Sequence, residues 1–376
     1  MTVTKKHLME VDLIKGLAII SVVLVHCLPY NDAFMTLRMF TFSMALLIFM
    51  LLMGRNMYAS FEKHNYMENG FHALNYLKNR LVRFLYPFIP VFVISIILGL
   101  LTNQDLYFGL YTLVGYLPLP GPGNYFVTVL LQFIIIFPLL YLAYKRYPRL
   151  TLIATFAISL LFELISPYIS ALNADAYIYY ANILRYLFVI TLGLWVLEAF
   201  EPTKRIRSNR ESAIVLIGLV VGVIYMVAFG IFHWEVPFFN TFWGTEYPTL
   251  GSYVVIVAFY PLVLYMLAYR ILPSNSGNKI IKFIAYVGKA SYHVFLVQIL
   301  FFAVFYNPYA TIFQSGLFDP VTSGIISIVV SLVVTLPLGV LFYKYEYVFD
   351  NLLDRLFRIK KEDSDLTSDR SLKKQN

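Results

Sequence analysis

The feature that most restricts the fold is a series of long apolar stretches separated by short polar breaks. Ten such stretches lie near 12–29, 39–54, 82–101, 125–144, 150–166, 178–199, 212–232, 249–272, 284–305 and 322–343. A helix needs about 20 apolar residues to cross the hydrocarbon core of a bilayer. These stretches have helical length and do not alternate as barrel strands do. We therefore expect an all-α, polytopic membrane protein with about ten transmembrane helices.

Composition excludes the soluble class. Hydrophobic residues make up 60% of the 376 positions and charged residues 13%, whereas soluble domains carry roughly a quarter charged residues to hydrate their surface. The single cysteine, Cys27, rules out an intramolecular disulfide.

The basic residues predict an orientation. Of the 29 lysines and arginines, Arg38 alone falls in an expected outer loop. Lys15, Arg185 and Lys289 are assigned to spans, and the others lie at or beyond the inner ends of spans. Cytoplasmic loops of membrane proteins are enriched in lysine and arginine. The pattern predicts a multi-pass protein of the plasma membrane with both termini in the cytoplasm, and it explains the net charge of +8 without a nucleic-acid partner.

The chain is expected to form one ten-span membrane domain over 1–358. The segment 359–376 is polar and mixed in charge, which predicts a disordered cytoplasmic tail. The apolar stretch 106–119 contains Gly115 and Pro118 and is followed by Pro120. Because proline disfavours helix at and before its position, we expect a loop or re-entrant piece there.

Ionisable residues inside spans are costly in lipid and therefore mark candidate functional positions. Asp12 and Lys15 are three residues apart on the first helix and are expected to pair. His26 follows Lys15 by eleven residues, about 16 Å along a helix and on the same face. Histidine is suited to proton transfer near neutral pH, although a hydrogen-bonded histidine within a helix bundle is the alternative.

Three further positions follow from depth and spacing. Arg80 and Arg83 lie one helical turn apart at the inner entry of the third span, where they could hold a phosphate or only mark topology. Arg185 lies too deep in the sixth span to reach the interface, and Glu163 at a similar depth is its expected partner. The sequence contains no Cys/His metal set, so no metal site is expected.

Seven short motifs occur in order through most of the chain. They are Asp12-x-x-Lys15-Gly16-x-Ala18 followed by His26; the apolar run from Phe42 to Gly54; Arg80-x-x-Arg83 with Pro87; Gln132-Phe133-x4-Pro138; Arg185 with Gly193; Gly288-x-x-Ser291-Tyr292-x3-Leu296-x-Gln298; and Glu346. In this order they resemble the integral-membrane acyltransferase 3 family, which moves acetyl or other short acyl groups onto extracytoplasmic sugars.

The resemblance implies an O-acyltransferase with acyl-coenzyme A, foremost acetyl-coenzyme A, as donor. A sugar or polysaccharide hydroxyl would be the acceptor and the lipid bilayer the setting. It further implies that His26 and Arg185 are catalytic and that Lys15, Arg80 and Arg83 bind the donor. The residues implied to bind substrate or support the structure are Asp12, Glu163, Ser291 and Gln298.

Departures from the family pattern keep two alternatives open. Lys15 stands where the family has arginine, Gln298 replaces a common histidine, and the His-x-Trp pattern of many members is missing from 123–126. One alternative is a polysaccharide or small-solute transporter whose buried charges line a pathway. The other is a catalytically inactive relative that acts as a membrane partner.

Overall fold

The computed structural model of the chain describes residues 8–27, 40, 44–64, 73–170, 172, 175–230, 232, 254–305 and 308–356. The expected disordered tail, 359–376, lies outside the described residues.

Within these ranges the chain is helical and contains no strand, which confirms the all-α class. The elements are α1 (Met9–Cys27), α3 (Met44–His64), α4 (Ala73–Leu101), η2 (Leu110–Val114), α5 (Tyr125–Arg146), α6 (Pro148–Ile165), η3 (Ser166–Tyr168), α8 (Ala176–Tyr180), η4 (Ile183–Arg185), α9 (Leu187–Ala199), α10 (Asn209–Gly230), α12 (Val254–Val257), α13 (Phe259–Ile271), α14 (Lys279–Lys289), α15 (Ser291–Val304), α16 (Pro308–Gln314) and α17 (Pro320–Leu356).

Eight of the helices in the described part of the chain are long and apolar enough to cross a membrane, compared with the ten expected. They lie within Met44–His64, Leu74–Leu101, Tyr125–Arg146, Pro148–Ile165, Asn209–Ala228, Val254–Ile271, Ser291–Gln314 and Pro320–Phe349. The expected first span, α1, is 19 residues long but carries Glu10, Asp12 and Lys15 near its start. The expected sixth span is represented by α9, which has only 13 residues.

The prediction of one continuous helix over 178–199 is wrong, because the chain breaks between α8 and α9. Asn182 is extended there and its side chain accepts a hydrogen bond from the Leu184 amide, which starts the short 3-10 turn η4. Asparagine is a favoured residue at a helix start because its side-chain oxygen replaces a missing backbone partner. The expected ninth span is also interrupted, at Ala290 between α14 and α15.

The glycine and prolines predicted that the segment 106–119 would not form a long helix, and the structure confirms this. It contains only the five-residue turn η2, which ends at Gly115 with a φ of 98°. That left-handed backbone favours glycine because other residues carry a Cβ that clashes there. The segment then runs back through Gly121 and Gly123 into α5.

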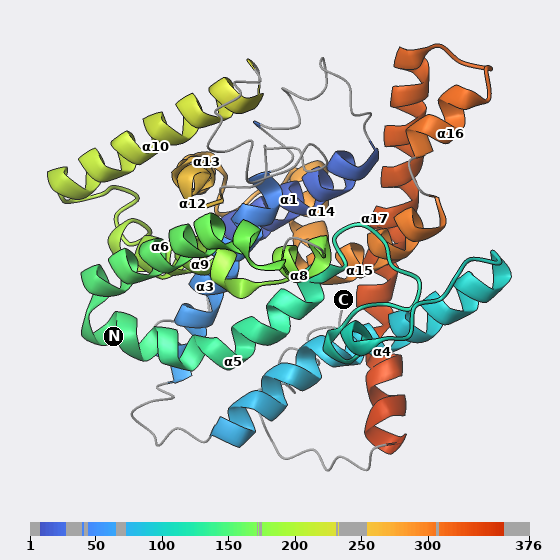
Figure 1. The fold of residues 1–376 in the computed structure, drawn as a ribbon, viewed down its shortest axis with the longest axis horizontal. Coiled ribbons are helices and arrows are strands. Elements are labelled where there is room, and N and C mark those ends of the chain that lie inside the picture. The colour runs from blue at the N-terminus through green and yellow to red at the C-terminus, as the bar shows by residue number, and fades with distance from the viewer. Residues whose placement is uncertain are drawn as a thin grey trace.

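Helix α1 crosses the middle of the bundle, while α10 and α17 lie towards opposite sides of it (Figure 1). It packs against α14, α17, α15, α3 and α13. Two glycine pairs allow close helix contact. A Cβ at Gly16 would overlap the Ile284 carbonyl, and one at Gly288 would overlap that of Asp12. A Cβ at Gly54 or at Gly193 would likewise overlap a backbone carbonyl of the facing helix, which allows α3 and α9 to pack closely. Small residues let helix backbones approach closely, which favours association in membranes.

The outside of the bundle is apolar along several helices. Large hydrophobic side chains are exposed at Leu216 and Ile224 on α10, at Ile153 on α6, and at Val329 and Val333 on α17. A soluble protein rarely exposes so many large apolar side chains. The exposure fits lipid contact, and the chain is a multi-pass membrane protein.

Candidate active site

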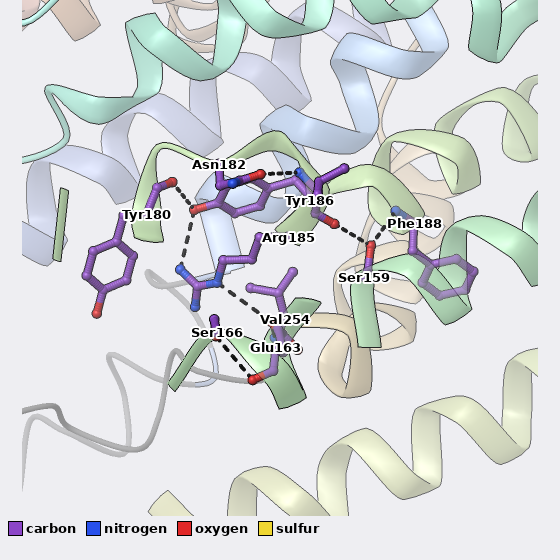
Figure 2. A network of polar contacts seen from close by, with 10 residues as sticks. Ser159, Glu163, Ser166, Tyr180, Asn182, Arg185, Tyr186, Phe188 and Val254 are labelled. Carbon is purple, nitrogen blue, oxygen red and sulfur yellow. Dashed lines mark hydrogen bonds and ion pairs between the residues drawn. The ribbon is translucent and has the colours of Figure 1, made fainter. Parts of the chain in front are cut away.

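A buried ion pair joins α6 to the broken segment before α9 (Figure 2). The Arg185 Nε lies 3.6 Å from Oε1 of Glu163, and both side chains are almost fully buried. The same Glu163 oxygen accepts a hydrogen bond of 2.6 Å from the Val254 amide. The structure therefore confirms the expected pairing of Arg185 with Glu163, and it adds the start of α12 as a third contributor.

Tyrosines surround the Arg185 guanidinium. Its Cζ lies 4.6 Å from the ring centroid of Tyr179, 4.9 Å from that of Tyr180 and 5.6 Å from that of Tyr186. Arginine is attracted to the negative face of an aromatic ring, most strongly where water is excluded. Nη1 also donates to the Tyr186 hydroxyl over 3.4 Å. The charge is held in one place by aromatic faces and a carboxylate.

Two polar side chains from neighbouring helices satisfy the backbone where the helix is broken. Gln132 of α5 donates to the Ala181 carbonyl over 2.7 Å and accepts from the Ile183 amide over 3.0 Å. Ser159 of α6 donates to the Leu184 carbonyl over 2.7 Å (Figure 2). Irregular backbone at membrane depth needs such partners because lipid offers none. Gln132, quoted above only as part of a motif, thus has a structural function that the sequence did not reveal.

His26 lies in the last turn of α1, next to α15. Its side chain is half-buried, and its ring centroid is 5.7 Å from that of Phe302. The carbonyl of the following residue, Cys27, accepts a hydrogen bond of 2.9 Å from Ser327 of α17. Helices α15 and α17 therefore position the end of α1 that carries the imidazole.

The other end of α1 carries a cluster of charged side chains. Lys15 Nζ lies 3.4 Å from Asp12 Oδ1, so this expected pair is confirmed. The charges of Arg55 on α3 and Arg83 on α4 both act on the Lys15 ammonium. Arg83 thus lies within electrostatic range of Lys15, and Arg83 itself is exposed. Lys15 pairs with Asp12 and Arg55 pairs with Glu201, so exposed Arg83 is the cation here best suited to bind an anion.

Arg80 is placed differently from Arg83. Its Nη2 lies 2.5 Å from Oγ of Ser60 on α3, and its side chain is half-buried. The hydrogen bond from Arg80 to Ser60 joins α4 to α3, although Arg80 lies only one helical turn from exposed Arg83.

Sequence reasoning missed Arg55, which lies beyond the end of the expected second span. Its Nε and Nη2 form a bidentate pair with Glu201 over 2.8 and 2.6 Å, and Tyr265 donates to the same carboxylate over 2.7 Å. All three side chains are buried. The expected second span ended at Gly54, whereas α3 continues ten residues past that glycine and so includes Arg55. The sequence signal for Arg55 was its position directly after the close-packing Gly54.

A family model for an acyltransferase domain, acyltransferase 3, matches residues 9–344, which include every site residue described above. The chain belongs to the acyltransferase 3 family. It is therefore a membrane acyltransferase. No curated protein and no solved structure matches the chain significantly.

Two further motif positions of this acyltransferase 3 member lie on α15. Gln298 is fully buried, and its Nε2 lies 3.4 Å from the Pro122 carbonyl in the loop before α5. Ser291 is the half-buried first residue of α15. Gln298 precedes Phe302 by four residues, so both lie on one face of the helix. Helix α15 thus connects the loop before α5 to His26.

Two positions at the other end of α15 are explained by packing. His293 is buried, with its Nε2 3.4 Å from Oε2 of Glu346 on α17. Lys289, assigned to the ninth span in the sequence, instead lies exposed at the last residue of α14. The break at Ala290 ends α14 there, so Lys289 faces outwards and is not a buried charge. No group of three or more metal-ligating side chains occurs in the described ranges.

Proposed function

We propose that this acyltransferase moves an acetyl or other short acyl group from cytoplasmic acyl-coenzyme A to a hydroxyl of an extracytoplasmic sugar or polysaccharide. The proposal includes the plasma membrane as location and cytoplasmic termini. The observation that carries it is the distribution of chemistry along α1. Lys15, with Arg55 and Arg83 nearby, lies at one end, and His26 lies eleven residues further at the other. That separation is about 16 Å along the helix axis.

The donor fits the positive end. Coenzyme A is an anion with several phosphates, and arginine and lysine bind phosphate through charge-assisted hydrogen bonds. Exposed Arg83 and half-buried Lys15 would hold these phosphates, and Arg80 would support Arg83 through its bond to Ser60. Asp12 would orient the Lys15 ammonium.

The reacting groups belong to the opposite end. As the acceptor oxygen attacks the thioester carbonyl, His26 takes the hydroxyl proton. The carbon–sulfur bond then breaks and the thiolate leaves with a proton, giving coenzyme A and the ester. In a variant of this route, His26 first carries the acyl group itself. Arg185 would stabilise the negative charge that develops on the carbonyl oxygen, held in position by Glu163 and the surrounding tyrosines.

The test is thiol release by purified protein given acetyl-coenzyme A and a panel of glycans. We expect His26→Ala to abolish release, while His64→Ala at the end of α3 retains it as a matched loss of one histidine. Release that survives in the His26→Ala variant would remove the imidazole from the mechanism. Transport of a glycan across vesicles without acyl donor would instead favour a carrier.

A further inference from the structure

Four tyrosines gather where the loop before α5 meets α8. The outer tyrosine cluster consists of Tyr107, Tyr111, Tyr116 and Tyr177. The ring centroid of Tyr177 lies 4.7 Å from those of both Tyr111 and Tyr116, and the centroid of Tyr107 lies 5.1 Å from that of Tyr116. Tyr107 is 37% exposed and the other three are half-buried. The cluster is therefore open to ligands on at least one side.

Hydrogen bonds fix the orientation of two of these rings, those of Tyr111 and Tyr177. The Tyr111 hydroxyl donates to Oδ2 of Asp175 over 2.6 Å, and the other Asp175 oxygen accepts from the Tyr177 amide over 2.8 Å. The Tyr177 hydroxyl lies 2.5 Å from Thr128 Oγ1 on α5. Asp175 is itself half-buried. Preorganised aromatic faces beside a few fixed polar groups are the usual composition of a small-molecule site.

Helix α8 connects this cluster to the candidate active site. It is only five residues long, with Tyr177 in the outer tyrosine cluster and Tyr179 and Tyr180 against the Arg185 guanidinium. Residues 177 and 180 are less than one helical turn apart, about 4.5 Å along the axis. A molecule bound on the cluster would therefore lie next to the elements that hold Arg185.

The charge of the surrounding segments restricts the ligand. Residues 102–124 and 166–182 contain two aspartates, Asp105 and Asp175, and no lysine or arginine. Both charged side chains of these segments are carboxylates, which disfavour the approach of an anionic ligand. A pyranose sugar without charge has an apolar C–H face that covers an aromatic ring and hydroxyls at its edge that reach a carboxylate or a phenol.

We propose that the outer tyrosine cluster binds the acceptor glycan and that this glycan is built of uncharged pyranose units. The word acceptor rests on the function proposed above, whereas binding of a neutral sugar does not. Tyr107, whose ring stacks on that of Tyr111, supplies the exposed stacking face, and Asp175 accepts hydroxyl hydrogen bonds. The bound sugar then presents its next unit towards Arg185.

The test measures binding of maltohexaose, cellotetraose and chitotetraose to purified protein in nanodiscs by saturation-transfer NMR, with no acyl donor present. An oligogalacturonate of similar length is the anionic probe. We expect at least one neutral probe to bind, the anionic probe to bind more weakly, and Tyr111→Ala to weaken the neutral probe about tenfold, the equivalent of one lost aromatic contact. Tyr107→Ala, at an exposed position, should give a similar loss without affecting folding.

Tyr309→Ala is the matched control, because Tyr309 stacks on Phe313 in another partly exposed aromatic pair on α16. It should leave binding unchanged. Failure of every neutral probe to bind the wild type overturns the proposal, as does equal binding by wild type, Tyr107→Ala and Tyr111→Ala. The last result would make the cluster an aromatic belt at the headgroup level. Because no donor is present, these outcomes are independent of His26 and thiol release.

Discussion

The Arg185 guanidinium and the Glu163 carboxylate lie 3.6 Å apart, on two elements that no continuous helix joins. Glu163 comes from α6 and Arg185 from the 3-10 turn η4, which exists only because the expected helix over 178–199 is broken. The pair therefore links the break in the backbone to the charge that we assign to the reaction.

Removing one partner of this pair should destabilise the protein strongly. Glu163→Ala leaves a buried guanidinium without its carboxylate, which costs about 3 kcal/mol or more in buried pairs. The double variant Glu163→Ala/Arg185→Met removes both charges and should regain part of the lost stability. Thermal unfolding in detergent checks this, and a double variant no more stable than Glu163→Ala would contradict the account.

The close approach of α1 and α14 should make Gly16 intolerant of a side chain. A Cβ there would overlap the Ile284 carbonyl, and overpacking of this kind typically costs about 1–3 kcal/mol. Gly324 in α17 is the matched control, since a Cβ there meets nothing within 4 Å. Gly324→Ala should be neutral or stabilising by up to about 1 kcal/mol. Equal melting temperatures for the two variants would show that the contact is not tight.

Arg83 should act on donor affinity. Losing one charge-assisted hydrogen bond to a phosphate costs roughly 1.5 kcal/mol, or about tenfold in binding. We expect Arg83→Ala to raise the KM for acetyl-coenzyme A by about this factor, with a smaller change in kcat. High salt should reduce the difference because exposed charges are screened. Arg149→Ala, at an exposed arginine on α6, is the control, and an equal rise in its KM would show that general surface charge is responsible.

The start of α17 should depend on pH. Hydrogen bonds from the Thr322 hydroxyl and amide hold the pKa of Asp319 below its usual value. The carboxylate is thus favoured in the folded state, so its stabilisation is present above the ordinary value of about 4 and is lost as the pH falls through the lowered pKa. Hydrogen exchange of the 321–323 amides, corrected for intrinsic rates, should show weaker protection at pH 3 than at pH 7. Asp319→Asn, which still caps the helix, should abolish this pH dependence, and unchanged wild-type protection would contradict it.

The sequence was sufficient to predict those features of the structure that depend on a single physical rule. Apolar length predicted the helical membrane class, and the three-residue spacing of Asp12 and Lys15 predicted a pair that forms over 3.4 Å. The depth of Arg185 predicted a partner, and Glu163 is that partner.

The sequence was insufficient to predict where polar side chains take the place of backbone hydrogen-bond partners. The break before α9 depends on Gln132 and Ser159, which come from two other helices, so no local pattern in 178–199 reveals it. Arg55 was hidden for a similar reason, because its partner Glu201 is 146 residues away. Lys289 was placed in a span because apolar residues continue on both sides of the break at Ala290.

The most direct test of the account is acyl transfer between two compartments. Radiolabelled acetyl-coenzyme A is enclosed in proteoliposomes, and a panel of membrane-impermeant glycans is added outside. We predict that the label appears on an external glycan with the wild type, that it does not with His26→Ala, and that donor and glycan placed on the same side give no transfer. Equal transfer with both substrates on one side, or transfer by the His26→Ala variant, would contradict a donor held near Lys15 and Arg83 that reacts at the far end of α1.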